Sequence, residues 1–129
     1  MTGGRCGVVV AHGGLAEGFL SALARVAGEQ DNIWPLSNHG LTGEELEDRI
    51  RGILTERRAG REAYLLSDMD GGSCGQACRR LLADGVVKAV FFGVNLPLLV
   101  EFVFLQDEPF ERFTALAVDK ARTALGAHR

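Results

Sequence analysis

The stretch Val8-Val9-Val10-Ala11-His12-Gly13-Gly14 predicts a buried β-strand that ends in a histidine and two glycines. An apolar run without polar alternation is typical of a central parallel strand that is covered on both faces. Open α/β sheets bind their ligands at the carboxyl ends of the strands. His12 is therefore the first candidate for a functional side chain. Its alternative role is that of a hydrogen-bonded structural histidine.

Outward from this stretch, apolar runs alternate with segments whose apolar residues recur at helical spacing. The alternation predicts βαβ units, and hence an α/β protein: a three-layer sandwich with a mainly parallel central sheet and helices on both faces. Pro35 favours an edge position for the second strand, and the expected strand order is 2-1-3-4. The predicted strands cover residues 6–11, 32–36, 63–67 and 86–92, and the predicted helices cover residues 16–27, 42–57, 73–83, 95–105 and 110–125.

The composition favours one ordinary globular domain over residues 1–129, with 47% hydrophobic and 24% charged residues. The formal net charge of −3 comes with no basic stripe, which argues against a nucleic-acid partner. The longest apolar stretch, residues 86–105, is interrupted by Lys88, Pro97 and Glu101. We therefore expect a strand and a helix there and no membrane span. The absence of a secretory signal pattern at the N-terminus favours a cytoplasmic location.

The three cysteines, Cys6, Cys74 and Cys78, make an odd count. Cys74 and Cys78 lie four residues apart on a predicted helix, with no second pair of ligands near them in the sequence. We therefore expect no metal site, and interpret the cysteines as free thiols in a reducing compartment. His39 and His128 fall in a loop and in a tail, where a solvated role is favoured over metal binding.

Right-handed crossovers bring the loops after strands one, three and four to one edge of the sheet. Asp68 follows the third strand there, where its carboxylate can accept a hydrogen bond from the Nδ1–H of His12. That contact would fix the tautomer of the ring and leave Nε2 as the free nucleophilic nitrogen. The alternative for Asp68 is a turn or capping aspartate.

Small residues follow Asp68 and lead into the next predicted helix. Gly71, Gly72 and Ser73 offer backbone N–H groups at a helix N-terminus, an arrangement that suits an oxyanion or a phosphate. Gly13 keeps side chains away from the ring of His12, so that a partner can reach it. Ser73 is predicted to cap the helix. The alternative is a simple tight turn into a capped helix.

The segment Gly71–Gly75 also matches the nucleophile-elbow pattern G-x-S-x-G, which raises a hydrolase with Ser73, His12 and Asp68 as its triad. The chain order argues against this hypothesis, because His12 comes first and the α/β-hydrolase histidine comes last. The gap between the third strand and Ser73 is also too long for a sharp elbow. The phosphate-binding interpretation is therefore preferred.

The chain resembles the IIA domain of the mannose/fructose/sorbose family of the phosphoenolpyruvate-dependent sugar phosphotransferase system. Three segments carry most of the resemblance, with a small addition from Leu116-Ala117-Val118. They are Val9-Val10-Ala11-His12-Gly13, Leu66-Ser67-Asp68 leading to Gly71-Gly72-Ser73, and Gly93-Val94-Asn95-Leu96-Pro97-Leu98-Leu99-Val100-Glu101. The resemblance covers nearly the whole chain.

The resemblance implies a phosphocarrier without a cofactor. His12 would accept a phosphoryl group from the phosphohistidine of HPr, through Nε2, and pass it to an EIIB component that serves a membrane transporter. Asp68 would orient His12, and Gly13, Gly71, Gly72 and Ser73 would bind the phosphate. The family fold is usually a homodimer that exchanges an edge strand, for which residues 102–105 and Phe110 are candidate contacts.

Two alternatives stay open within this resemblance. One is a regulatory protein of the same system, whose phosphorylation state controls a partner, since no EIIB domain follows in the chain. The other is a dihydroxyacetone-kinase phosphotransferase subunit, which shares the fold and a similar histidine. Asp70 departs from the family pattern, in which a bulky or neutral residue often stands at this position. A second carboxylate near His12 would repel a phosphoryl group, unless it points away or helps to bind a partner.

Overall fold

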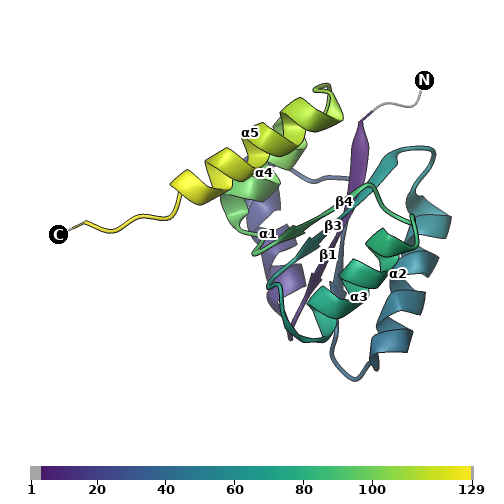
Figure 1. Ribbon diagram of the computed structural model, residues 1–129. Helices are drawn as coiled ribbons and strands as arrows, with labels where there is room; N and C mark the ends of the chain where they lie inside the picture. Colours follow the sequence, from purple (N-terminus) through teal and green to yellow (C-terminus); the bar gives the residue numbers. More distant parts are fainter. Residues whose placement is uncertain (1–3, 129) are drawn as a thin grey trace.

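The computed structural model describes residues 4–128 and contains one four-stranded sheet (Figure 1). The strand order is β2-β1-β3-β4, and each neighbouring pair is parallel. Both the parallel sheet and the predicted order 2-1-3-4 are therefore confirmed. The strands are β1 (Arg5–Ala11), β2 (Ile33–Ser37), β3 (Glu62–Ser67) and β4 (Ala89–Phe92).

Helices cover both faces of the sheet, which confirms the predicted three-layer sandwich (Figure 1). One face is covered by α1 (Leu15–Ala27), α4 (Leu96–Phe104) and α5 (Phe110–Thr123), and the other by α2 (Gly43–Arg57) and α3 (Gly72–Ala83). Thr42 caps α2 with a capping box: its Oγ1 accepts from the N–H of Glu45, and the Glu45 carboxylate accepts from the N–H of Thr42.

The central strand β1 is buried along its whole length and divides the interior into two cores. Val8 and Val10 pack with residues of α2 and α3, whereas Val9 and Ala11 pack with residues of α1, α4 and α5. This alternation follows from the two-residue period of a strand. The uninterrupted apolar run in the sequence thus reflects a strand with no solvent-facing side.

Aromatic rings fill much of the core beneath α4 and α5. The ring of Tyr64 on β3 meets those of Phe102 and Phe113 edge to face, with centroids 5.9 and 5.6 Å apart. The guanidinium of Arg5 stacks on Phe113 with its central carbon 4.0 Å from the ring centroid, and Nη1 donates to the carbonyl of Leu105 at 2.6 Å. Arg5 therefore fixes the turn between α4 and α5 to the start of β1.

The predicted start of the fourth strand is wrong by three residues. The strand begins at Ala89 instead of Val86, because the N–H of Val86 donates to the carbonyl of Leu81 at 3.0 Å and closes the end of α3. A buried turn and a buried strand are equally apolar, so the predicted strand was too long at its start. Val86 still packs against the core.

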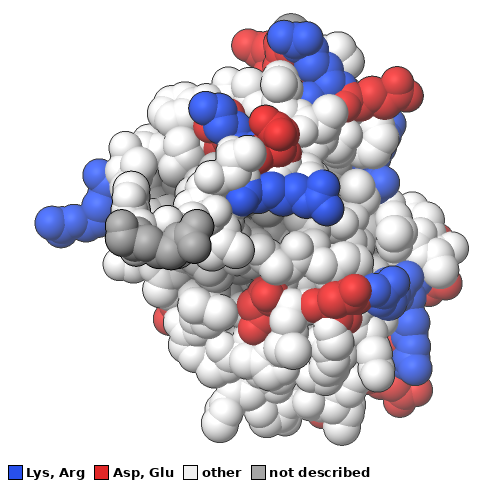
Figure 2. All heavy atoms as spheres, turned by 60° about the vertical axis from the view of Figure 1, so that its left-hand side comes forward, with Lys and Arg blue, Asp and Glu red and all other residues white. Residues whose placement is uncertain are grey.

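Charges of both signs are interspersed on the face shown in Figure 2, where Lys and Arg form no continuous basic stripe. Across residues 4–128, no helix combines the length and the apolar character that crossing a membrane requires. The apolar segment after residue 86 is a turn, a short strand and a nine-residue helix, α4.

Replacing Phe102 by Ala is expected to lower the free energy of unfolding by about 3–5 kcal/mol, because a fully buried ring leaves a cavity in the core. Urea unfolding followed by circular dichroism measures this loss. Val26→Ala on α1 is the control: Val26 is 59% exposed, and we expect a change within about 0.5 kcal/mol. Equal losses in the two variants would contradict the core assignment.

Candidate functional site

His12 directly follows β1 at the carboxyl edge of the sheet. Its carbonyl accepts a hydrogen bond from the N–H of Leu15 at 3.2 Å, which starts the turn into α1. Gly13 adopts φ +56°, in the left-handed region that favours glycine. The side chain of His12 is 42% exposed, so that a partner in solution can reach the ring.

Asp68, directly after β3, holds His12 by two groups at once. Oδ2 of Asp68 accepts from the backbone N–H of His12 at 3.0 Å and lies 2.8 Å from Nδ1 of the ring. The side chain of Asp68 is only 9% exposed. A carboxylate accepts from Nδ1 only when that nitrogen carries a proton, so the contact favours the tautomer whose Nε2 holds a free lone pair.

The charge of Asp68 is stabilised by these contacts. Burial on its own raises the pKa of the Asp68 carboxyl, but the hydrogen bonds from the His12 backbone and ring outweigh burial, and the pKa lies below its usual range. Asp68 is therefore ionised at neutral pH. Its second oxygen, Oδ1, is buried and has no hydrogen-bond partner among the described residues.

Helix α3 begins beside the ring of His12. A Cβ built on Gly72 would lie 3.3 Å from Nε2, and the backbone there has φ +77°. Gly71 precedes the helix, and no side chain caps it. The N-terminus of α3 therefore lies next to Nε2 of His12, and its N-cap residue offers no side-chain acceptor to the first N–H groups of the helix.

The sequence predicted that Ser73 caps α3, and this prediction is wrong: Ser73 lies inside the first turn of the helix, and Gly71 is the N-cap residue. Its Oγ accepts from Nδ2 of Asn38 at 3.1 Å, which leaves the hydroxyl proton free to donate. Within residues 4–128, no hydrogen bond joins Ser73 to His12, so the contact that a serine-hydrolase triad requires is missing.

Asp70, the acid that the sequence left unexplained, forms an ion pair with Arg79 of α3. The guanidinium of Arg79 also stacks on Phe92, with its central carbon 4.6 Å from the ring centroid. The carboxylate is therefore compensated by a cation from the next helix. Gly75 lets α3 approach this loop, since a Cβ there would stand 2.0 Å from the carbonyl oxygen of Asp70.

Sequence reasoning missed two residues near His12. Asn38 follows β2 and its N–H donates to the carbonyl of Ala11 at 3.1 Å, which sets it at the same edge as His12. The predicted edge comprised only the loops after strands one, three and four, although β2 is parallel to β1 and its carboxyl end lies at the same edge. Cys74, on α3, lies with His12 and Asp68 in one cluster whose potential ligand atoms are all within 4.8 Å of one another. No spacing in the sequence indicates that contact.

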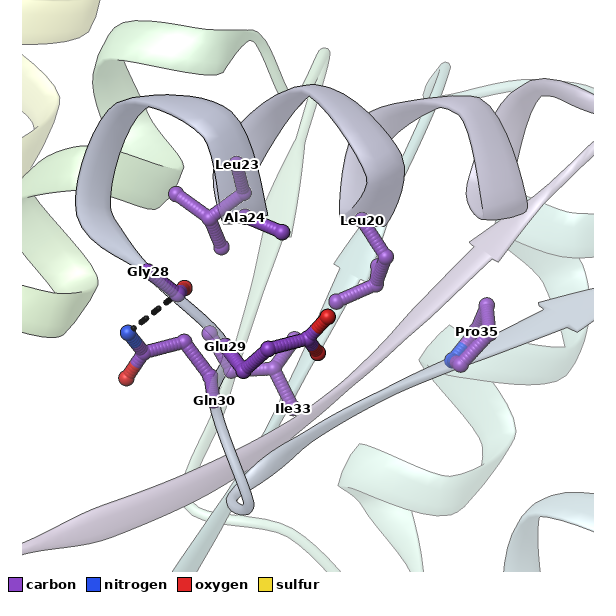
Figure 3. A pocket seen from close by; sticks show the side chains of 8 residues that line it. All are labelled: Leu20, Leu23, Ala24, Gly28, Glu29, Gln30, Ile33 and Pro35. Atoms are coloured by element: carbon purple, nitrogen blue, oxygen red, sulfur yellow. Dashed lines mark hydrogen bonds between the residues drawn. The ribbon is translucent and has the colours of Figure 1, made fainter.

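A separate depression of about 200 Å³ lies between α1 and β2, away from His12 (Figure 3). Leu20, Leu23 and Ala24 form its helical wall. Gln30 also lines the depression, and its side-chain amide donates to the carbonyls of Ala27 and Gly28 at the end of α1. The amide of Gln30 therefore serves the helix end, and no residue that lines this depression belongs to the site around His12.

Comparison with known families matches residues 7–114 to EIIA-man, described as "PTS system fructose IIA component". Among curated proteins, the chain is 32% identical over 123 residues to the PTS system mannose-specific EIIAB component of Escherichia coli (strain K12). The same protein from Shigella flexneri shows equal identity. Each match covers 93% of this chain and 38% of the relative, so the chain spans well under half of these relatives.

Solved structures give the same grouping. The phosphotransferase system component EIIA from Streptococcus agalactiae shares the fold, with a TM-score of 0.84 and 21% identity over 95% of this chain and 96% of that chain. The PTS IIA protein associated with the fucose utilization operon from Streptococcus pneumoniae has a TM-score of 0.82 and 27% identity, over 98% and 94% of the two chains.

We expect neutral His12 to carry its proton on Nδ1, because Asp68 accepts from that nitrogen. Long-range ¹H–¹⁵N correlation spectra above neutral pH distinguish the two tautomers. In Asp68→Ala, the spectrum of His12 should shift to the mixed pattern shown by His39, which is exposed and serves as the internal reference. An Nε2–H tautomer in the unsubstituted protein would contradict this assignment.

The lowered pKa of Asp68 predicts an acid-sensitive contribution to stability. The contribution is present above the pKa of an unfolded aspartate, about 3.9, and is lost as the pH falls through the lower value in the folded protein. The urea midpoint of the unsubstituted protein should therefore fall more steeply below about pH 4 than that of Asp68→Asn. Parallel curves would exclude a stabilised carboxylate at this position.

Proposed function

The chain belongs to the EIIA-man family of phosphotransferase-system components, and we propose that it is a phosphocarrier in sugar uptake. In this proposal, His12 accepts a phosphoryl group from the phosphohistidine of HPr and passes it to an EIIB component. The observation that supports it most is the contact of 2.8 Å between Nδ1 of His12 and a buried carboxylate, with Nε2 left free.

The transfer follows from the state of the ring. The Nε2 lone pair attacks phosphorus in line, the bond from phosphorus to the donor imidazole nitrogen breaks, and the electron pair stays on the donor ring. The Nδ1 proton remains on His12, so the phosphorylated ring carries a positive charge. Asp68 compensates that charge at 2.8 Å, which stabilises the intermediate, while the phosphoryl group stays transferable to the next acceptor.

Gly13, Gly71, Gly72 and Ser73 are proposed to bind the phosphoryl oxygens. The N-terminus of α3 favours an anion by about 0.3–1 kcal/mol where it is exposed. The hydroxyl of Ser73, oriented by Asn38, supplies one further donor. A Cβ built on Gly13 or Gly71 would meet nothing within 4 Å, so the incoming phosphohistidine has room at this edge.

The second carboxylate of the loop does not oppose this chemistry. Asp70 is paired with Arg79, so its charge adds little repulsion at a phosphoryl group on His12. Asp70 lies on the same loop as Asp68, Arg79 lies on α3, and both side chains are exposed. We infer that Asp70 and Arg79 contribute to the surface that a protein partner meets.

HPr and an EIIB component are the proposed partners, in the cytoplasm, with contact to a membrane only through transporter components. The proposal of a homodimer rests on β4, which forms one edge of the sheet, and on Phe104, which is 67% exposed. Phe102, one of the candidate contacts from the sequence, is fully buried inside the core and is therefore unsuited to that role.

With phosphoenolpyruvate, enzyme I and HPr, the protein should gain one acid-labile phosphate, and His12→Ala should gain none. Phosphorylation followed by intact-protein mass spectrometry measures this. His39→Ala and His128→Ala are matched controls, because both histidines are exposed and the contacts to Asp68 come from His12. Asp68→Asn should accept phosphate about 10–100-fold more slowly, as for other carboxylates that orient a histidine.

Equal labelling of His12→Ala would overturn the proposal. When His12 is labelled, addition of an EIIB domain distinguishes the phosphocarrier from the regulatory protein. Passage of the phosphate from His12 to EIIB supports the carrier. Retention of the phosphate by the phosphorylated protein would favour the regulatory role instead.

A further inference from the structure

A thiol lies next to the histidine–aspartate pair, and the proposed phosphoryl transfer gives it no task. Cys74 belongs to the first turn of α3 and is fully buried. Its Sγ, a carboxylate oxygen of Asp68 and a ring nitrogen of His12 all lie within 4.8 Å of one another. Thiolate, carboxylate and imidazole are the ligands that zinc takes in proteins.

We propose that His12, Asp68 and Cys74 form a binding site for a divalent transition metal, Zn²⁺, and that the metal excludes phosphorylation of His12. The first part of this proposal stands on the geometry of the cluster alone. Only the second part rests on the function proposed above.

An independent observation indicates a missing partner at this cluster. Oδ1 of Asp68 is buried and has no hydrogen-bond partner among residues 4–128, although its side chain is only 9% exposed. A buried carboxylate oxygen without a partner costs free energy that a bound cation removes. Oδ2 meanwhile serves His12, so Oδ1 is the oxygen that remains for an ion.

The distances suit a small tetrahedral ion. Bonds of about 2.0–2.3 Å separate the ligands of such a site by roughly 3.3–3.8 Å, so the widest separation in the cluster, at most 4.8 Å, has to shrink by about 1.0–1.5 Å. His12 is the exposed member of the cluster, with 42% of its side chain open to solvent, and in this proposal water occupies the fourth position. Three protein ligands and one open position are also the pattern of zinc sites that exchange their fourth ligand.

The charges balance when Zn²⁺ binds. Cys74 loses its thiol proton to solvent, and the thiolate and the Asp68 carboxylate together neutralise the ion. Burial, and next the charge of Asp68, raise the pKa of the free Cys74 thiol to about 11, so the metal has to displace a proton that is otherwise retained. The imidazole stays neutral throughout.

The position of the imidazole proton explains the exclusion. Nδ1 faces Asp68, and when this nitrogen binds the metal its proton has to move to Nε2. Protonated Nε2 has no lone pair for a phosphoryl group. The zinc-bound ring is therefore held in the tautomer opposite to the one that phosphorylation requires.

The contacts also supply a matched control. Cys78 lies one helical turn beyond Cys74, is equally buried and has a free thiol, but is not part of the cluster. Cys74→Ser and Cys78→Ser therefore remove the same group from neighbouring turns of one helix. A general loss of folding would appear in both variants and in their circular dichroism spectra.

Titration of the metal-free protein with Co²⁺, as a spectroscopic substitute for Zn²⁺, tests the site. We expect one equivalent to bind with a thiolate-to-cobalt charge-transfer band, which Cys78→Ser retains and Cys74→Ser loses. Competition of Zn²⁺ against a chromophoric chelator should show at least tenfold weaker binding in Cys74→Ser. Equal spectra and affinities in the two variants, or no band in the unsubstituted protein, would overturn the metal site.

A second arm tests the exclusion separately. Stoichiometric Zn²⁺ should slow phosphorylation of the protein by HPr at least tenfold, relative to each protein's own rate without metal, and Cys78→Ser should respond equally. The rate of Cys74→Ser should change little in the same mixture, which controls for effects of zinc on the donor proteins. An equal response of both variants would overturn the exclusion. Failure of phosphorylation in the absence of zinc would concern only the proposed function, since the cobalt titration needs no phosphate donor.

Discussion

The burial of β1 on both faces, between β2 and β3, is the constraint on which the rest of the structure depends. A strand with no solvent-facing side needs helices on both faces of the sheet, and it fixes its register to both neighbours. Val10 pairs with Ser67 and Ala11 with Ser37. Asp68 and Asn38, the next residues along β3 and β2, are thereby brought to the end of β1, where His12 lies.

The site combines a buried anion with an exposed ring. Asp68 is nearly closed off from water, and there its contact with His12 is strong, since little solvent screens it. The ring itself is partly exposed, and Gly72 at the start of α3 lies next to its Nε2. The carboxylate of Asp68 thus sets which nitrogen of His12 is available to a partner. It also belongs to the cluster of His12, Asp68 and Cys74.

Several parts of the fold could be predicted from local patterns. The apolar run of β1, the capping box at Thr42 and Pro35 on an edge strand each reflect interactions between near neighbours in the chain. The prediction failed where another hydrogen-bond partner competes for a group. Val86 donates to the end of α3 instead of joining a strand, and Ser73 accepts from Asn38 instead of capping its helix.

The sequence by itself determined the α/β architecture, the strand order and the edge at which His12 and Asp68 meet, because hydrophobic periodicity and crossover handedness depend on local order along the chain. Only the tertiary structure decided which atoms meet at that edge. The pairing of Asp70 with Arg79, the support of Ser73 by Asn38 and the position of Cys74 beside His12 depend on how α3 packs against the loop before it. That packing is set by contacts among residues far apart in the chain, and no spacing in the sequence encodes them.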